Sequence, residues 1–364
     1  MLFVILPTRT DAGFGTEREA YALGLASRVV RLPEEALREG RVTQALSALL
    51  AAHDELHLLY AGTTVKAANE RSIVRLNRTS FGELSPFARD VLDATPRREW
   101  LLPVLAELLR PPTSDAGSCD TGRPAVTIAL CVHNDARYLP WAIYSVQRQT
   151  DPGWELLLVD DGSSPSQAPQ LPRLPRDSRI RLLRLPLNRG KAHALNAALA
   201  HAAGDWLLEL DADDWLPPDA LAQLLSAARG HGLRPLRRAE PQAVVAGHRL
   251  WRETSRGELM PQPGWSRPAS QEGGWHAFLE QGAVTAPRLF RTSALRSLGG
   301  WRTDDPSEGR LYEDQQMLAR FLHASLPILP MDAPLYHRRL RRGSTSQTAK
   351  AKASYAAWKA EWRP

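Results

Sequence analysis

The 364-residue chain has little cysteine and no long apolar run, and both absences limit what the protein can be. Only Cys119 and Cys131 are present, so neither a disulfide framework nor a zinc cluster is credible. The apolar stretch Leu2 to Leu6 is too short for a signal peptide, and no run reaches the ~18 residues of a membrane span. We therefore expect a cytoplasmic protein without a transmembrane segment.

The charge balance indicates an anionic ligand. The net charge is +6 and the isoelectric point is near 9.6, which suits a phosphate or a nucleotide. Aromatic and basic residues do not interleave as they do in nucleic-acid-binding segments, so we expect no nucleic-acid partner. The sequence carries no signal for an oligomeric state.

Composition divides the chain into two bodies. The segment from Arg110 to Pro124 is rich in Pro, Gly, Ser and Thr, which predicts a linker over residues 111–124. We expect an N-terminal α/β accessory domain over residues 1–110, a larger domain over residues 125–346 and a C-terminal helical tail over residues 347–364. The expected N-terminal strands are Leu2–Leu6, Arg28–Leu32 and Glu55–Tyr60, and the expected helices are Glu17–Ala26, Val42–Ala52, Pro86–Leu92 and Arg98–Leu109.

The larger body has the pattern of a doubly wound α/β sheet. Ligands in such sheets lie beyond the carboxyl ends of the strands. Polar clusters around Asn134, Asp161 and Asp213 fall at three consecutive strand ends, so we expect them to converge on one site. The expected strands are Ala125–Cys131, Trp154–Val159, Arg179–Leu185 and Asp205–Leu210, with helices at Leu139–Gln149 and Ala192–Ala203.

The segment Trp206–Asp214 carries three carboxylates directly after an apolar strand. Carboxylates this close repel one another unless a cation lies among them. Oxygen ligands in this arrangement suit Mg²⁺ or Mn²⁺, which one or two carboxylates hold together with substrate phosphates. The alternative is an acidic turn in which Asp213 or Asp214 caps a helix that begins near Pro217.

Five segments in order resemble the family 2 glycosyltransferases, which have the GT-A fold and use nucleotide sugars. The resemblance extends from Pro124 to Ser346, although Cys131-Val132-His133 replaces the family's usual Pro-Thr-Tyr. The matching segments are Thr127–Asn134 (TIALCVHN), Leu157–Ser163 (LLVDDGS), Asn188–Asn196 (NRGKAHALN), Glu209–Asp214 (ELDADD), and Leu298–Trp301 with Tyr312–Asp314 (LGGW and YED).

The resemblance implies a binding site for the nucleotide of the donor, with Asp161 accepting from the base. Taken alone, Asp161 is a turn aspartate before Gly162, and Lys191 is a solvated lysine beside a turn. A lysine at a helix N-terminus nevertheless places positive charge where phosphates bind. The residues expected to contact the nucleotide are Val132, Asn134, Asp160, Asp161, Asn188, Gly190, Lys191, Asp211 and Arg338.

The resemblance also implies a metal site and a general base. Asp211, Asp213 and Asp214 are the expected acidic ligands of Mn²⁺ or Mg²⁺, with His337 as a further ligand. Arg341 stands where the family has a histidine. Asp314 is the expected base, which would remove the proton of the acceptor as it attacks the anomeric carbon. The alternative for Asp314 is an acid at a helix N-terminus, favoured by the helix dipole.

These expectations describe a metal-dependent, inverting enzyme that transfers one sugar from a nucleotide-sugar donor, with UDP as the nucleotide, to a sugar, small-molecule or peptide acceptor. We expect Trp251, Trp265 and Trp275 to contact the acceptor, unless they wedge their loop against the core. The alternatives are a catalytically idle nucleotide-sugar-binding module and a sugar nucleotidyltransferase. The latter would need a Gly-rich basic loop after the first strand, where this chain has Cys131–Asp135.

Overall fold

The computed structural model describes residues 2–6, 28–32, 41–60, 74–78, 123–134, 138–164, 177–230, 240–253, 259–268, 286–305 and 307–341. The chain separates into two compact units, one holding Met1–Pro111 and Arg252–Met260, the other Pro112–Trp251 and Pro261–Pro364. Three expected helices (Glu17–Ala26, Pro86–Leu92 and Arg98–Leu109) lie outside the described residues, as do residues 347–364 and nearly all of the expected linker.

The first unit contains a four-stranded sheet in the order β2-β1-β3-β4. Its central strand β1 (Leu2–Leu6) runs parallel to β2 (Arg28–Arg31) and to β3 (Glu55–Tyr60), whereas β4 (Val74–Asn77) pairs antiparallel with β3. Helix α3 (Val42–Ala52) buries Val42, Leu46 and Leu50, which recur on one face of the helix, and it packs on β3.

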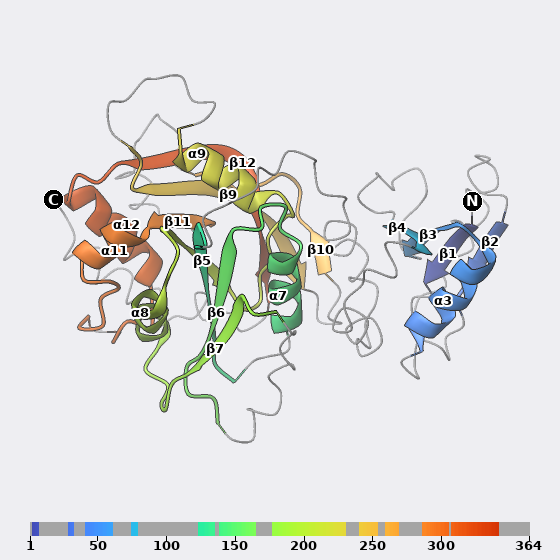
Figure 1. Cartoon of the computed structure of the whole chain (residues 1–364), viewed down its shortest axis with the longest axis horizontal. Coiled ribbons are helices and arrows are strands. Elements are labelled where there is room, and N and C mark those ends of the chain that lie inside the picture. The colour runs from blue at the N-terminus through green and yellow to red at the C-terminus, as the bar shows by residue number, and fades with distance from the viewer. Residues whose placement is uncertain are drawn as a thin grey trace. The chain divides into compact units, whose positions relative to one another are not determined.

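The second unit is built on an eight-stranded mixed sheet in the order β10-β9-β11-β8-β5-β6-β7, with β12 paired to β9 (Figure 1). Strands β8 (Trp206–Asp211), β5 (Val126–Val132), β6 (Trp154–Asp160) and β7 (Ile180–Arg184) are parallel. Strand β11 (Arg288–Arg291) lies antiparallel between β8 and β9 (Ala243–Glu253). The remaining strands are β10 (Leu259–Pro261) and β12 (Ile328–Leu340).

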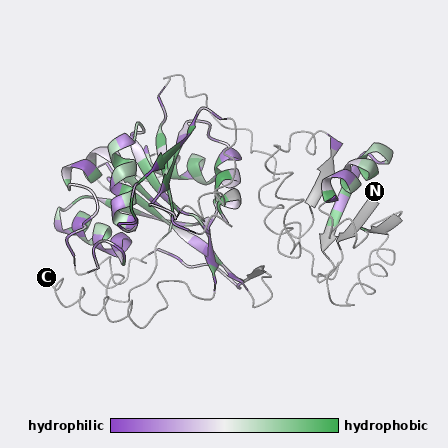
Figure 2. Cartoon of the chain, turned by 90° about the horizontal axis from the view of Figure 1, so that it is seen from below, coloured by the Kyte–Doolittle hydropathy of each residue, from purple (hydrophilic) through white to green (hydrophobic). Residues whose placement is uncertain are grey.

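Helices cover both faces of this sheet, because its central strands are apolar on both sides. Along β5, Ile128 and Leu130 face one core cluster and Ala129 faces the other. The first cluster includes α7 (Leu139–Gln147) and α9 (Ala220–Ala228), and the second includes α8 (Lys191–His201), α11 (Thr292–Ser297) and α12 (Glu313–His323). Figure 2 shows the hydrophobic residues gathered on the strands and inner helix surfaces. The predicted α/β fold with a doubly wound mixed sheet is confirmed.

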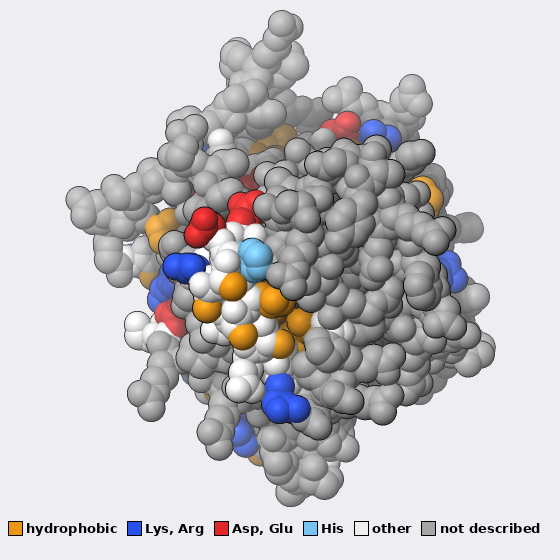
Figure 3. Space-filling model, turned by 90° about the vertical axis from the view of Figure 1, so that its right-hand side faces the viewer, with side chains coloured by type: hydrophobic (Ala, Val, Ile, Leu, Met, Phe, Trp, Pro, Cys, Tyr) orange, Lys and Arg blue, Asp and Glu red, His pale blue; other side chains and the backbone are white. Residues whose placement is uncertain are grey.

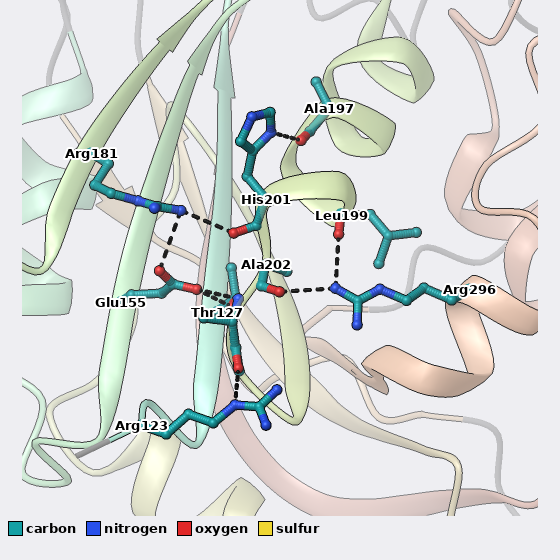
Figure 4. Close-up of polar contacts among 11 residues, drawn as sticks. Arg123, Thr127, Glu155, Arg181, Ala197, Leu199, His201, Ala202 and Arg296 are labelled. Atoms are coloured by element: carbon teal, nitrogen blue, oxygen red, sulfur yellow. Dashed lines mark hydrogen bonds and ion pairs between the residues drawn. The ribbon is translucent and has the colours of Figure 1, made fainter.

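The carboxyl end of α8 is fixed to the edge of the sheet by side chains. The buried carboxylate of Glu155 accepts hydrogen bonds from the Thr127 hydroxyl (2.6 Å) and from the backbone N–H of Ala203 (2.7 Å). Three arginines donate to carbonyl oxygens at this helix end: Arg123 to Ala203, Arg181 to His201 and Arg296 to Ala202 (Figure 4). These bonds satisfy carbonyls that have no partner within the helix, and their positive charge suits its negative end. The opposite, amino end of α8 is thereby set at the candidate site.

The described surface is mixed in character. On the face in Figure 3, apolar side chains lie beside acidic and basic ones and a histidine. Among the described residues Leu187 is the large hydrophobic side chain that is strongly exposed, at 68%. No helix within the described ranges is both long enough and apolar enough to cross a bilayer.

Candidate active site

A cavity of about 390 Å³ lies at the carboxyl ends of β5 and β8, next to the beginning of α12 and the end of β12. This is the edge where parallel strands of a doubly wound sheet present ligand-binding residues. The expected site residues that line it are Val132, Lys191, Asp211, Asp213, Asp214, Asp314 and Arg338. The acids at the end of β8 and the acid at the start of α12, far apart in sequence, therefore line one cavity.

Each of the three acids at the end of β8 has a different partner. Asp211 accepts from the Lys191 ammonium at 2.7 Å, and Asp213 accepts from Arg341 Nε at 2.8 Å. Asp214 is buried, and its carboxylate accepts from the backbone N–H of Arg339 at 2.7 Å. Two of the three carboxylates thus pair with side-chain cations, while the third joins the turn after β8 to β12.

The ionisation of these acids follows from burial and mutual repulsion. Burial, and then the charge of Asp211, raise the pKa of Asp213. Burial together with the charges of both neighbours raises the pKa of Asp214 well above the usual aspartate range. Burial also opposes ionisation of Asp211, but Lys191 and Arg288 outweigh it and lower the pKa of that carboxyl. Asp213 is therefore an acid that an added cation would stabilise in its charged form.

Lys191 joins two elements of the site. It is the first residue of α8, directly after Gly190, whose φ of +97° places the backbone in a region that favours glycine. Its ammonium contacts Asp211 at 2.7 Å and Glu313, the first residue of α12, at 2.8 Å. Burial opposes the charge, yet these two carboxylates raise the pKa of Lys191 well above its ordinary value. Lys191 is therefore a fixed cation at a helix N-terminus, where anions bind.

Asp161 supports the loop before α8 and does not line the cavity. Its two carboxylate oxygens accept from the backbone N–H groups of Arg189 (3.1 Å) and Gly190 (2.9 Å). Asn188 accepts from Gly190 N–H at 3.1 Å and from the Arg310 guanidinium at 2.8 Å. The expected nucleotide residues Asp161, Asn188 and Gly190 thus shape the turn that delivers Lys191.

Asp160 and Asn134 have similar loop-holding contacts. The buried Asp160 accepts from Ser163 N–H at 3.0 Å. Asn134 has a positive φ of 53°, and its side-chain oxygen accepts from Ser164 N–H at 2.8 Å. Asn134 thus connects the ends of β5 and β6, whereas Asp160 holds the loop that follows β6, and neither residue is part of the cavity lining.

Asp314 lies in the first turn of α12 and faces the cavity. One of its carboxylate oxygens accepts from the backbone N–H of Gln315 at 2.8 Å, and the other lies 3.2 Å from a guanidinium nitrogen of Arg288. The preceding Tyr312 has a left-handed φ of 58°, which turns the chain into the helix. Asp314 is therefore an acid at a helix N-terminus, and it also lines the cavity, as a general base would have to.

The end of β12 supplies basic residues. Arg338 lines the cavity and makes no hydrogen bond or ion pair with any described side chain. The Arg339 guanidinium lies 4.0 Å from the ring centre of Tyr138. Arg338 is therefore the arginine of this strand best placed to receive an anion.

His337 is not among the residues that line the cavity. Its ring stacks on Trp215 with the ring centres 5.1 Å apart, and its Nδ1 accepts from the Trp251 indole N–H at 2.9 Å. Because the backbones of His337 and Trp215 also pair, the imidazole is held in this buried aromatic cluster. The structure does not group it with the acids that line the cavity.

The expected acceptor tryptophans do not line the cavity either. Trp251 is buried beside His337. Trp265 packs on Gly247 so closely that an added Cβ there would lie 2.3 Å from the indole ring. Trp275 lies outside the described residues. For Trp251 and Trp265, packing against the core is the observed arrangement.

Two cavity residues carry no signal that the sequence analysis used. Arg288 comes from β11, and Arg310 comes from the loop before α12. The Arg310 guanidinium donates to the side-chain oxygen of Asn188 at 2.8 Å and to the backbone oxygen of Asn188 at 3.0 Å, and so holds this turn. Neither arginine lies in a recognisable motif, and the pairing of β11 with β8 and β9 brings Arg288 to this site.

The acidic residues fit a divalent cation that takes some of its ligands from the protein and the others from a substrate. No group of three or more His, Cys, Asp or Glu side chains is arranged as a metal site within the described ranges. Asp211 and Asp213 nevertheless face the same cavity and repel each other, as the raised pKa of Asp213 indicates. Mg²⁺ and Mn²⁺ are commonly held by only one or two carboxylates plus phosphate oxygens, so the donor set is compatible with either ion.

Comparison with known proteins gives a consistent family. Residues 127–299 match the family profile described as "Glycosyl transferase family 2". The succinoglycan biosynthesis protein ExoO of Rhizobium meliloti is 35% identical over 109 residues, which cover 30% of this chain and 31% of that protein. The undecaprenyl-phosphate 4-deoxy-4-formamido-L-arabinose transferase of Salmonella paratyphi B is 32% identical over 108 residues, or 28% of this chain and 33% of that protein. The matches thus span about a third of these relatives.

Solved structures give more distant similarities. The mannosyltransferase PcManGT from Pyrobaculum calidifontis, in complex with GDP-Man and Mn²⁺, has a TM-score of 0.44 at 20% identity, covering 70% of this chain and 69% of that one. Residues 1–349 of TarS from S. aureus, in complex with UDP-GlcNAc, have a TM-score of 0.43 at 17% identity, covering 62% and 61%.

Proposed function

We propose that this chain, whose residues 127–299 match the glycosyl transferase family 2 profile, transfers a single sugar from a UDP-sugar to a sugar, small-molecule or peptide acceptor. The observation that carries the proposal is that Lys191, Asp211, Asp213 and Asp314 line one cavity at the carboxyl edge of the parallel strands. A relative named as an undecaprenyl-phosphate transferase adds a polyprenyl phosphate to the acceptors worth testing.

In this proposal the diphosphate of the donor lies between the amino end of α8 and the end of β12. Lys191 offers a fixed ammonium at the helix N-terminus, and Arg338 offers a guanidinium that no described side chain engages. Asp161 acts indirectly by holding the Arg189–Gly190 backbone and so the direction in which α8 begins.

Asp211 and Asp213 would hold the Mn²⁺ or Mg²⁺ ion. When bound, such an ion neutralises charge that develops on the departing nucleoside diphosphate. The protein contributes two carboxylates on one turn, while the buried Asp214 fixes that turn to β12. Arg341 and Lys191 pair with Asp213 and Asp211, so both cations lie beside the carboxylates where the phosphates would also be held.

Asp314 is the proposed general base. Its carboxylate faces the cavity from a rigid helix, where it can accept the proton of the acceptor as the acceptor oxygen bonds to the anomeric carbon and the diphosphate leaves. This single displacement inverts the anomeric configuration.

The first test is the titration of UDP into the protein with and without Mn²⁺. We expect UDP to bind more tightly with Mn²⁺, and Asp213→Ala to remove this difference. Asp332→Ala is the matched control, because Asp332 pairs with Arg267 on the surface and does not line the cavity. Equal UDP affinity of wild type and Asp213→Ala in the presence of Mn²⁺ would exclude Asp213 as a ligand.

The second test measures turnover. UDP-glucose, UDP-galactose and UDP-N-acetylglucosamine are screened for release of UDP, without acceptor and with monosaccharide or polyprenyl-phosphate acceptors. For the best donor, Asp314→Asn should lower kcat by ~10²-fold or more, the usual scale for loss of a general base, while UDP affinity stays unchanged. Turnover near the wild-type value would rule out Asp314 as the base.

A further inference from the structure

Arg288 is a buried arginine that touches two carboxylates of the second unit. It lies on β11, and its guanidinium contacts Glu209 on β8 and Asp314 on α12. We propose that Arg288 is a positioning residue that fixes the direction of the Asp314 carboxylate for proton transfer. This inference rests on the proposed role of Asp314 as the general base.

The pair with Glu209 anchors the arginine. The two side chains are 5% and 1% exposed, and Nη2 of Arg288 lies 2.6 Å from Oε2 of Glu209. Burial would lower the pKa of Arg288, but Glu209 and Asp314 outweigh it and raise the pKa, so the guanidinium stays charged. An arginine buried this deeply requires a partner charge, and Glu209 provides it at the base of the site.

The other terminal nitrogen of the same guanidinium contacts the candidate base. Nη1 of Arg288 lies 3.2 Å from Oδ2 of Asp314, whose side chain is 18% exposed. Glu209, Arg288 and Asp314 have formal charges of −1, +1 and −1. Because Glu209 neutralises Arg288, the three side chains together keep one negative charge. Glu209 and Arg288 are far less exposed than Asp314. The remaining negative charge therefore faces the cavity on the Asp314 carboxylate.

The two carboxylate oxygens of Asp314 have different partners. Oδ1 accepts from the backbone N–H of Gln315 at 2.8 Å, and Oδ2 faces Arg288. Together these contacts restrict rotation of the carboxylate. Misplacement of a reacting group by ~1 Å can cost ~10²-fold in rate, so loss of one contact should lower turnover without weakening donor binding.

The ability of arginine to bridge two carboxylates makes Arg288→Lys the informative substitution. Lysine keeps the buried positive charge beside Glu209, but a single ammonium cannot reproduce the planar fork. Arg291→Lys is the matched control, since Arg291 lies on the same strand, pairs with the exposed Glu240 and does not line the cavity.

The experiment is a double-mutant cycle between positions 288 and 314, with kcat for UDP release from the best of the three UDP-sugars and with UDP affinity measured by titration. We expect Arg288→Lys to lower kcat by ~10-fold or more at unchanged UDP affinity, with Arg291→Lys close to wild type. In the Asp314→Asn background Arg288→Lys should have almost no further effect, because residues that act as a unit are not additive.

The outcomes separate the two ideas. If the kcat losses of Arg288→Lys and Asp314→Asn multiply, Arg288 acts independently of Asp314 and the inference is wrong, while the base assignment stands. If Asp314→Asn retains wild-type turnover, the base assignment fails, and the positioning role fails with it. A variant pair, Arg288→Met with Glu209→Gln, removes both buried charges together. It should show the same non-additive loss, and additive losses there would also overturn the inference.

Discussion

The pairing of Arg341 with Asp213 predicts that this arginine controls the affinity of the site for divalent ions. Arg341 Nε lies 2.8 Å from Oδ2 of Asp213, and the two side chains are 31% and 23% exposed. A divalent ion that uses this carboxylate must displace or share the guanidinium. Replacing Arg341 with Gln should therefore raise the affinity for Mn²⁺.

The size of the effect follows from the exposure of the pair. Fully exposed ion pairs contribute ~0.2–1 kcal/mol. Two unit charges 4 Å apart interact by ~4 kcal/mol at the effective dielectric constant of ~20 near a protein surface. A pair whose side chains are 31% and 23% exposed lies between these limits, at about 1.4–2.8 kcal/mol, which corresponds to a 10- to 100-fold increase in Mn²⁺ affinity.

The assay is Mn²⁺ titration without nucleotide, followed by calorimetry or by the electron paramagnetic resonance signal of free Mn²⁺. Arg338→Gln is the control, because it removes the same charge from the same cavity without touching Asp213. We expect Arg338→Gln to raise the affinity by less than ~5-fold, since its charge acts only at a distance. Equal effects of the two substitutions would refute direct competition, and so would an unchanged affinity in Arg341→Gln.

Two further predictions concern His337, which is buried, and Cys131, which is half-buried. His337→Phe removes the acceptor of the Trp251 indole N–H, so it should lower the free energy of unfolding by ~1–3 kcal/mol in urea titrations. Mn²⁺ affinity should stay within about twofold, and a loss of ~10-fold or more would show that His337 supports the metal site, either as a ligand or through one. Burial raises the pKa of the Cys131 thiol, and the thiolate is the form that reacts. Cys131 is half-buried and lines the cavity, so iodoacetamide at about pH 8 should label it more slowly in the folded protein than in urea, as read by peptide mass spectrometry. Rapid labelling of the folded protein would contradict this.

The parallel core of the second unit could be predicted from the sequence because its strands are continuous apolar runs. The expected strand Trp154–Val159 corresponds to β6 (Trp154–Asp160), and Asp205–Leu210 corresponds to β8 (Trp206–Asp211). In the first unit the expected helix Val42–Ala52 has the bounds of α3. The four-residue strand β4 was not predicted, since Val74–Asn77 is too short for a periodic pattern to be evident.

The site was harder to predict, because local patterns do not specify long-range partners. The sequence indicated that acids at strand ends would converge, and Asp213 and Asp314 do line one cavity. For Asp161 it offered both a contact with the base and a turn aspartate before Gly162, and it did not indicate that Asp161 would hold the Arg189–Gly190 backbone. Arg288 could not be found at all, because its contact with Glu209 depends on the register of Leu289 opposite Leu208.

The hydrogen bonds of Lys191 have a mechanical consequence for substrate entry. Its ammonium ties α8 to Glu313 on α12, and deeper in the fold Asn196 exchanges two hydrogen bonds of 2.8 Å with the backbone of Trp301. Lys191, the cation proposed for the phosphates, and Asp314, the base proposed for the acceptor, thus lie on two helices that are joined to each other. The distance between these two groups should therefore persist when substrate enters the cavity.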